Sequence, residues 1–297
     1  MLKLCVDIGG TKTIVGVVNE HSEIIDQKRF QTFTSDPQQQ FSEIIEIAHQ
    51  FTQHYEQLDK SILNIAMPGP CDYRKGIFLN PPNLQAYNQF DAGQYIEMNS
   101  DFQPNFVNDT DAAIISEYQH IKDETDNFIY ITISTGVGMA YVKDGRLVSG
   151  VDGNFGEVGH TIIKGNSDYL CPVCQQYGCV ENEISGTAMS RKASDLLQRD
   201  VSTREAIDMY MKRENQAITE MIDEVLTLTQ QLCTNLISIF NTYHIVLGGG
   251  VTQSKLPYSE KIIDYAKAHH LIKDVPLKVK VSDLEANVLT GLYYINE

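Results

Sequence analysis

Short apolar runs separated by polar, glycine-containing turns recur along the chain and predict strands that alternate with helices. The first run is a strand at residues 2–6, and the turn Asp7–Lys12 joins it to a second strand at residues 13–18. The same plan returns at residues 128–142, around the turn Ser134–Gly138. Two such hairpins, each opening half of the chain, predict two similar α/β domains that face each other across a cleft.

Helical periodicity fills much of the sequence between these hairpins. Asp36 and Pro37 are the expected N-cap and first residue of a helix whose apolar positions continue through Tyr55 to Leu58. A longer helix is expected from about Asn215 to Asn241, with Ile239 on its apolar face. Other strands are expected at residues 61–66, 76–79, 105–107, 245–247 and 277–281, and other helices from 112, at 258–269 and at 285–295.

One histidine and three cysteines stand close together in the sequence and form a potential metal-binding group. Three thiolates and one imidazole complete the ligand set of a closed, tetrahedral, structural zinc. A redox pair or inert buried thiols are the alternatives, but a redox CxxC usually opens a helix after a strand. Glu157 and Glu181 bracket the group, so a bound metal would also fix where these carboxylates point. The four residues are His160, Cys171, Cys174 and Cys179.

The turn after the first strand has the features of a phosphate site. Two adjacent glycines, Gly9 and Gly10, allow backbone N–H groups to converge on an anion. The spacing is not that of a Walker loop, and a hairpin turn without function is the alternative. Asp7 at the strand end and Thr11 beyond the glycines favour a phosphate and Mg²⁺ site.

Polar residues also follow three later strands. Asn83 lies in a proline-rich loop and is a candidate ligand contact or a turn-forming residue. Asn108–Asp111 stands where a strand meets a helix; Asp109 or Asp111 could cap that helix, which leaves one carboxylate to project towards a ligand. Gly248–Gly250 ends another strand and allows a close approach to the backbone, with a plain flexible turn as the alternative.

Composition narrows the class of protein. The chain has 297 residues and a formal net charge of −16, which disfavours binding to nucleic acid or to anionic membranes. The sequence contains no run of 18 apolar residues, and its N-terminus does not have the pattern of a signal peptide. We therefore expect a cytoplasmic protein, in which six cysteines indicate free thiols or metal ligands.

In this order and spacing, the motifs resemble the ROK family of sugar kinases and repressors across nearly the whole chain. The resemblance implies the actin-like, hexokinase-type ATPase fold. We expect a small domain at residues 1–116, to which a helix at about 285–297 returns, and a large domain at 117–284. The motifs are DIGGTK at 7–12, PGP at 68–70, ND at 108–109, STGVG at 134–138, GEVGH at 156–160, GCVE at 178–181 and LGGGV at 247–251.

The resemblance also implies roles for individual residues. Asp109 would be the general base that accepts the proton of a sugar hydroxyl. Asp7 would hold Mg²⁺, and His160 would bind structural Zn²⁺ through one ring nitrogen and face the sugar with the other. The expected sugar contacts are Gly69, Asn83, Asn108, Asp109, Glu157, His160 and Glu181. The expected ATP contacts are Asp7, Gly9, Gly10, Thr11, Lys12, Thr135, Gly136, Gly249 and Gly250.

The chain departs from the family pattern at two places. The family's usual cysteine spacing is C-x-C-G-x-x-G-C, whereas this chain has C-x-x-C-x-x-x-x-C, with Gln175 in place of the glycine. A CxxC spacing still suits zinc, and the changed spacing lies in the loop that leads to Glu181. Asp111 stands where the family often has a small residue, and its charge would raise the pKa of a nearby base.

The leading hypothesis is an ATP-dependent hexose kinase of glucokinase type, expected to form a homodimer. The alternatives are a kinase for N-acetylmannosamine, fructose or a phosphorylated glycoside. A sugar-responsive repressor is disfavoured because the first glycine turn begins at Asp7, which leaves no room for a preceding DNA-binding domain, and because the chain is acidic. A binding-only protein is disfavoured because the expected base and phosphate turns are both present.

Overall fold

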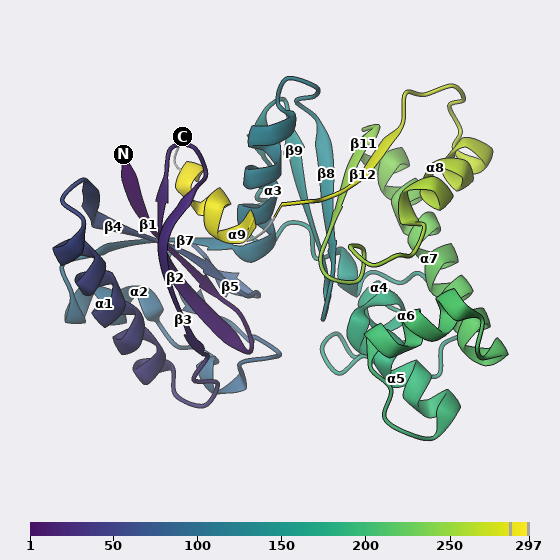
Figure 1. Ribbon diagram of the computed structural model, residues 1–297, viewed down its shortest axis with the longest axis horizontal. Helices are drawn as coiled ribbons and strands as arrows, with labels where there is room; N and C mark the ends of the chain where they lie inside the picture. The colour runs from purple at the N-terminus through teal and green to yellow at the C-terminus, as the bar shows by residue number, and fades with distance from the viewer. Residues whose placement is uncertain (285–286, 296–297) are drawn as a thin grey trace. The chain divides into compact units, whose positions relative to one another are not determined.

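The computed structural model describes residues 1–284 and 287–295, which form two compact units (Figure 1). Unit 1 comprises Met1–Glu124, Leu147–Phe155 and the described residues from Leu284 onward. Unit 2 comprises Thr125–Arg146 and Gly156–Asp283. Each unit contains one five-stranded sheet covered by helices, and unit 1 also contains the small hairpin of β5 (Cys71–Asp72) and β6 (Ile77–Phe78).

The sheet of unit 1 has the order β3-β2-β1-β4-β7. β1 and β2 form an antiparallel hairpin in which Leu2 pairs with Asn19 and Ile8 with Thr13. β4 runs parallel to β1, and β7 runs parallel to β4. The edge strand β3, which the sequence pattern did not indicate, pairs antiparallel with β2. The bounds are β1 Leu2–Ile8, β2 Lys12–Asn19, β3 Ile24–Gln31, β4 Leu58–Met67 and β7 Gln103–Asn108.

Alternation along the strands gives this sheet two buried faces. Leu4, Val6 and Ile8 belong to the same apolar cluster as residues of α1 (Pro37–His54) and α2 (Ala92–Asn99). Cys5, between them, packs instead with α3 (Asp109–Ile121) and α9 (Asn287–Gly291). Successive residues of β1 therefore fix helices on opposite faces of the sheet, while the turn after Ile8 stays at its edge.

Three local predictions in unit 1 need correction. α1 begins as expected, with Asp36 accepting a hydrogen bond from Gln39 N, but it ends at His54. Tyr55 is its C-cap and Leu58 already belongs to β4, so their helical spacing arose by chance. The helix expected from residue 112 begins at Asp109 because the side chain of Asn108, rather than an aspartate, is its N-cap.

The start of the closing helix expected at residues 285–295 lies outside the described residues. Within them, this segment forms α9 and the short turn η3 (Leu292–Tyr294).

Unit 2 repeats the strand pattern of unit 1. Its sheet has the order β10-β9-β8-β11-β12, in which β8 and β9 form an antiparallel hairpin. β11 runs parallel to β8, and β12 runs parallel to β11. The two sheets thus share one arrangement, as the repeated hairpin pattern predicted. The bounds are β8 Phe128–Ile133, β9 Val137–Lys143, β10 Arg146–Leu147, β11 His244–Gly248 and β12 Lys278–Val281.

Helices dominate the rest of unit 2. The longest is α7 (Gln216–Phe240), which agrees with the helix expected from about Asn215 to Asn241, has these two residues as its caps, and packs against α8 (Tyr258–His269). Ile239, expected on its buried face, is 71% exposed because it lies on the same face of the helix as the exposed residues Asn235 and Ser238. The other helices are α4 (Val180–Ile184), α5 (Gly186–Leu197) and α6 (Thr203–Lys212). Among the described residues, no helix has the length and apolar character needed to cross a membrane.

Candidate active site

The turn between β1 and β2 presents backbone N–H groups at the edge of the unit 1 sheet. Its carbonyl groups face inward: Gly9 O accepts from Thr32 Oγ1, and Lys12 O accepts from Gly9 N. In the described part of the chain, the N–H groups of Gly10 and Thr11 have no protein acceptor. A Cβ added at Gly10 would lie 3.3 Å from the Cβ of Asn83, so the structure places this predicted sugar contact against the turn.

Two acidic residues of unit 1 have raised pKa values, Asp7 at the end of β1 and Asp109 in the first turn of α3. Burial and, to a smaller extent, the charge of Asp109 raise the pKa of Asp7 to about 7, and Lys12 opposes the rise. Burial also raises the pKa of Asp109, against hydrogen bonds from Thr110 N at 2.7 Å and Thr110 Oγ1 at 3.2 Å. This pair is suited to accept a proton or to approach a cation.

Hydrogen bonds through Tyr73 connect Asn108 with the loop that contains Gly69. Asn108 uses its side-chain oxygen as the helix cap and donates through Nδ2 to Tyr73 Oη at 2.8 Å. Tyr73 Oη in turn contacts Met67 O at 3.5 Å, at the end of β4 where the Pro68–Pro70 segment begins. Asn154 holds the same loop through Cys71 N and Cys71 O.

In unit 2, the corresponding turn between β8 and β9 is held by residues of α4 and α5. Glu181 Oε2 accepts from Val137 N at 3.0 Å, and a Cβ on Gly136 would lie only 2.5 Å from the same oxygen. Thr187 Oγ1 donates to Thr135 O at 2.8 Å. Glu181 is therefore both a candidate sugar ligand and a contact of the turn predicted to bind phosphate.

A cavity of about 1120 Å³ lies next to this turn within unit 2. Thr135 and Gly250 line it, together with residues at the starts of α5 and α6, where helix N-termini favour an anion. Gly249 is in the left-handed region at φ 89°, and a Cβ there would lie 2.4 Å from Ile133 O, so glycine is required. The basic side chains at the cavity are Arg191, Arg204 and Lys255, and the one acidic side chain is Asp208.

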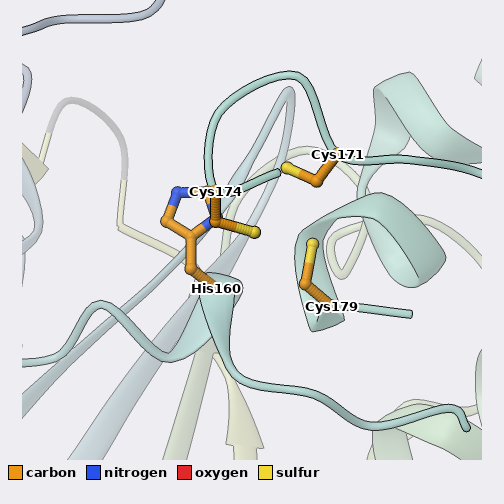
Figure 2. A group of neighbouring side chains, drawn as sticks. All are labelled: His160, Cys171, Cys174 and Cys179. Carbon is orange, nitrogen blue, oxygen red and sulfur yellow. The ribbon is translucent and has the colours of Figure 1, made fainter. Parts of the chain in front are cut away.

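The predicted metal ligands gather in one place. The donor atoms of His160, Cys171, Cys174 and Cys179 all lie within 4.8 Å of one another. Figure 2 shows the three sulfur atoms directed into the space between the side chains, with the imidazole of His160 beside Cys174. His160 Nδ1 is buried and has no hydrogen-bond partner. An orphaned ring nitrogen beside three thiols fits a tetrahedral zinc, and the CxxC spacing does not prevent the gathering.

The thiols of this group differ in acidity. Burial opposes ionisation of Cys171, but backbone N–H groups of Cys174 and Val173 lower the pKa of its thiol below the usual range. Burial and the neighbouring thiols raise the pKa of Cys179 to about 12. A dication would remove this difference by favouring all three thiolates.

Adjacent residues of α5 fasten the metal-binding segment and α4. Arg191 donates to Asn182 Oδ1 at 2.8 Å and to Asn182 O at 2.9 Å, and it lies 4.2 Å from the ring centroid of Tyr169. Lys192 Nζ lies 2.5 Å from Glu183 Oε2, with both side chains buried. Because Asn182 and Glu183 directly follow Glu181, these contacts hold the helix that carries that carboxylate.

The remaining predicted residue, Glu157, is exposed and precedes the turn η2 (Val158–His160), where His160 N donates to Glu157 O at 3.1 Å. The sequence interpretation did not single out Arg191, Arg204 or Lys255. The capping-box pattern Ser-Thr-Arg-Glu at residues 202–205 is the sequence signal for the helix N-terminus found at this point, with Arg204 in its first turn.

Comparisons with known proteins agree along the full chain. Residues 3–286 match the ROK family. An N-acetylmannosamine kinase of Vibrio vulnificus is 28% identical over 301 residues, covering 100% of this chain and 99% of that protein. An N-acetylmannosamine kinase of Yersinia pestis is 29% identical over 275 residues, covering 93% and 91%.

Solved structures show the same fold. The ROK hexokinase of Thermus thermophilus superposes with a TM-score of 0.85 at 24% identity, covering 98% of this chain and 96% of that one. A ROK family glucokinase of Streptomyces griseus, in complex with glucose and AMPPNP, gives 0.76 at 22% identity, covering 98% of each chain. The fold is the actin-like ATPase fold. With a family match that spans almost every residue, this chain belongs to the ROK family.

Proposed function

We propose that this ROK family protein is an ATP-dependent sugar kinase that transfers the γ-phosphoryl group of ATP to a hexose hydroxyl. The observation that carries the proposal is the grouping in unit 1 of Asp109, Asp7 and a turn with free N–H groups. Phosphoryl transfer needs an oriented nucleophile and neutralised phosphate charge, and these groups supply both. Family membership supports the same reaction class.

Asp109 is the proposed general base. Burial raises its pKa above that of an ordinary carboxyl, which makes it a stronger base for proton transfer from a hydroxyl. As the hydroxyl oxygen bonds to the γ-phosphorus, the bond to the β–γ bridging oxygen breaks, ADP leaves, and Asp109 takes the hydroxyl proton. Asn108, fixed by Tyr73 and by the α3 cap, would orient the sugar beside it.

The remaining roles follow the geometry of each unit. In unit 1, Gly9, Gly10, Thr11 and Lys12 would bind phosphate oxygens, and Asp7 would approach Mg²⁺, which neutralises phosphate charge. In unit 2, the cavity at Thr135 and Gly250 would hold the nucleoside, and its basic side chains would offset the acidic surface. Zinc at His160 and the three cysteines would be structural, since four protein donors leave no open position.

N-acetylmannosamine is the first sugar to test. Relatives named N-acetylmannosamine kinase match 93% to 100% of the chain, which favours this sugar over glucose, the first choice from the sequence. Glucose stays the second candidate because a fold neighbour contains it. The test is ADP release from Mg-ATP with N-acetylmannosamine, glucose, mannose, fructose, N-acetylglucosamine and a phosphorylated β-glucoside. If none of these sugars led to ADP release, the proposal would be contradicted.

Asp109→Ala should lower kcat by at least about 10³-fold while Mg-AMPPNP and the sugar still bind, because only proton transfer is lost. The matched control is Asp123→Ala, which removes an exposed carboxylate just beyond the other end of α3. Steady-state kinetics and calorimetry measure the two effects. Turnover of Asp109→Ala within tenfold of wild type would refute the base assignment.

A further inference from the structure

A buried chain of hydrogen bonds links helix α1 to the glycine turn of unit 1. Gln40 Nε2 donates to Thr13 Oγ1 at 2.7 Å, and Thr13 Oγ1 lies 3.0 Å from Thr32 Oγ1. Thr32 Oγ1 donates to Gly9 O at 2.7 Å. Gln40 and Thr13 have no exposed surface, and Thr32 is 4% exposed. These three buried polar side chains therefore form one series of hydrogen bonds, which ends at the backbone carbonyl of Gly9.

The available donors and acceptors fix the direction in which these hydrogen bonds run. Gln40 Oε1 accepts from Phe33 N at 3.0 Å, which assigns the amide and leaves Nε2 as the donor to Thr13. A threonine hydroxyl has one proton, and Thr32 uses its proton for the carbonyl of Gly9. Thr13 must then donate to Thr32. All donors run from Gln40 towards the turn, so the chain has a single orientation and cannot reverse without losing a bond.

The last bond of the chain determines where an N–H group points. The carbonyl of Gly9 and the N–H of Gly10 belong to one planar trans peptide, in which the two bonds point in opposite directions. Holding Gly9 O towards Thr32 therefore turns Gly10 N–H away from the interior, where no protein acceptor among the described residues meets it. Thr32 N also donates to Thr11 O at 3.1 Å, which fixes the peptide between Thr11 and Lys12 at the end of the turn. Glycines rotate easily about these bonds, so without such anchors the turn would lose its orientation.

We propose that Thr32, Thr13 and Gln40 are positioning residues that aim the N–H of Gly10 at the terminal phosphates of the nucleotide. This inference rests on the proposed function, because it assigns those phosphates to the Gly9–Lys12 turn. None of the three side chains touches the nucleotide; they act through the peptide between Gly9 and Gly10. Preorganised donors of this kind contribute to phosphate binding without reorganisation when the ligand arrives.

The decisive variant is Thr32→Val, which keeps the shape of the side chain. It removes the hydroxyl group and with it the hydrogen bond to Gly9 O. We expect the Kd for Mg-AMPPNP, measured by calorimetry on the full chain, to rise by about tenfold, as for the loss of one preorganised donor to a charged group. The Kd for AMP should change less than about twofold, because AMP lacks the terminal phosphates. Thr32→Ser, which keeps the hydroxyl, should bind Mg-AMPPNP within about threefold of wild type.

A matched control separates positioning from stability. Thr229 in unit 2 is also fully buried, and its hydroxyl donates to Val225 O at 2.8 Å. Thr229→Val should lower Tm about as much as Thr32→Val and leave the affinity for Mg-AMPPNP unchanged. If Thr32→Val fails to fold, Thr13→Val tests the same chain one bond further back, with an expected rise in Kd of about threefold.

Equal losses for AMP and Mg-AMPPNP in the folded hydroxyl variants, or no loss at all, would overturn the positioning role while leaving the proposed kinase intact. A wild-type protein that binds Mg-AMPPNP no better than AMP would overturn the assignment of the terminal phosphates to this turn, and the positioning role with it. A wild-type protein that binds neither nucleotide would overturn the proposed function as well. A selective loss for Mg-AMPPNP that Thr32→Ser rescues supports the inference.

Discussion

At the level of single residues, the carboxyls of Asp7 and Asp109 destabilise the free protein but favour its proposed function. Burial raises the pKa of both carboxyls in the folded chain, and the charge of Asp109 adds to the rise at Asp7. Uncompensated like charges destabilise a fold, and a cation or a shared proton relieves them. The free energy that the pair costs in the free protein is available to favour the binding of a cation with its nucleotide.

Asp7 should make the free protein less stable as pH rises. Its pKa is raised from 3.8 to about 7, so the folded state binds its proton more tightly than the unfolded state does. The stabilisation that the bound proton provides is fully present below about pH 4 and is lost as pH rises through 7. In magnesium-free buffer, Asp7→Asn should therefore gain on the order of 2 kcal/mol over wild type between pH 5 and pH 8.

Urea denaturation at several pH values measures this gain. Asp26→Asn, which removes a partly exposed carboxylate in β3, is the comparison and should follow wild type. A difference between Asp7→Asn and wild type that stays constant with pH would mean that Asp7 is not the titrating group.

At the level of elements, the short helix α4 depends on its longer neighbour. Five residues make a poor helix alone, since nucleation is costly and few bonds repay it. α5 compensates through Arg191 and Lys192, which hold Asn182 and Glu183 from one side. Burial opposes ionisation of Glu183, yet Lys192 and Ser167 lower its pKa. The orientation of Glu181 therefore depends on a neighbouring helix as well as on the metal-binding segment.

Lys192→Met should destabilise the protein by about 3–5 kcal/mol, because it leaves the buried carboxylate of Glu183 without its closest cation. The KM for the sugar should rise more than the KM for ATP, since Glu181 shares α4. The double variant Lys192→Met with Glu183→Leu should recover most of the stability. Denaturant titration and steady-state kinetics report the two effects.

The control for the buried Lys192–Glu183 ion pair is an ion pair whose side chains are exposed. Arg199 and Glu205 lie 2.6 Å apart with side chains 50% and 42% exposed, so Arg199→Met should cost less than about 1 kcal/mol. If Lys192→Met cost no more than Arg199→Met, α5 would not be the element that holds α4 in place.

The metal-binding segment should need zinc for its structure. Removing Cys174 takes one of four ligands, so Cys174→Ala should abolish stoichiometric zinc and lower Tm by at least about 5 °C. Elemental analysis and calorimetric melting measure the two effects. Cys233→Ala, which removes a buried thiol of α7 outside the group, should retain the metal. A full zinc content in Cys174→Ala, or an unchanged Tm, would contradict the structural role.

At the scale of the whole molecule, the sequence predicted the repeated architecture better than its details. Two hairpins with glycine turns indicated two related sheets, because strand alternation and turn chemistry are local signals. β3 escaped notice because four consecutive polar residues at 26–29 hide its alternation. α2 escaped because eight residues give too few apolar positions to define a period.

The residues of the candidate site also fall into two groups, those that the sequence reveals and those that it does not. The four potential metal ligands could be named from their spacing, and Asp7 and Asp109 from their places at strand ends together with the family resemblance. Thr13, Thr32 and Gln40 could not, because each is an ordinary residue whose role comes from a partner 19 to 27 positions away. Contacts of that range depend on strand pairing and helix packing, which no local pattern encodes.

The net charge of −16 gives a prediction for the whole protein. Mg-ATP is an anion and meets a repulsive long-range field, whereas the neutral sugars of the panel do not. The Debye length falls from about 30 Å at 0.01 M salt to about 8 Å at 0.15 M, which screens distant charges more than contacts within the cavity. Between these salt concentrations, at constant free Mg²⁺, we expect the KM for Mg-ATP to fall by about twofold while the KM for a neutral sugar stays constant. Steady-state kinetics at increasing concentrations of potassium chloride test this prediction. A KM for Mg-ATP that rises with salt would contradict it. Such a rise would mean that the electric field at the nucleotide comes mainly from the basic side chains at the cavity, Arg191, Arg204 and Lys255.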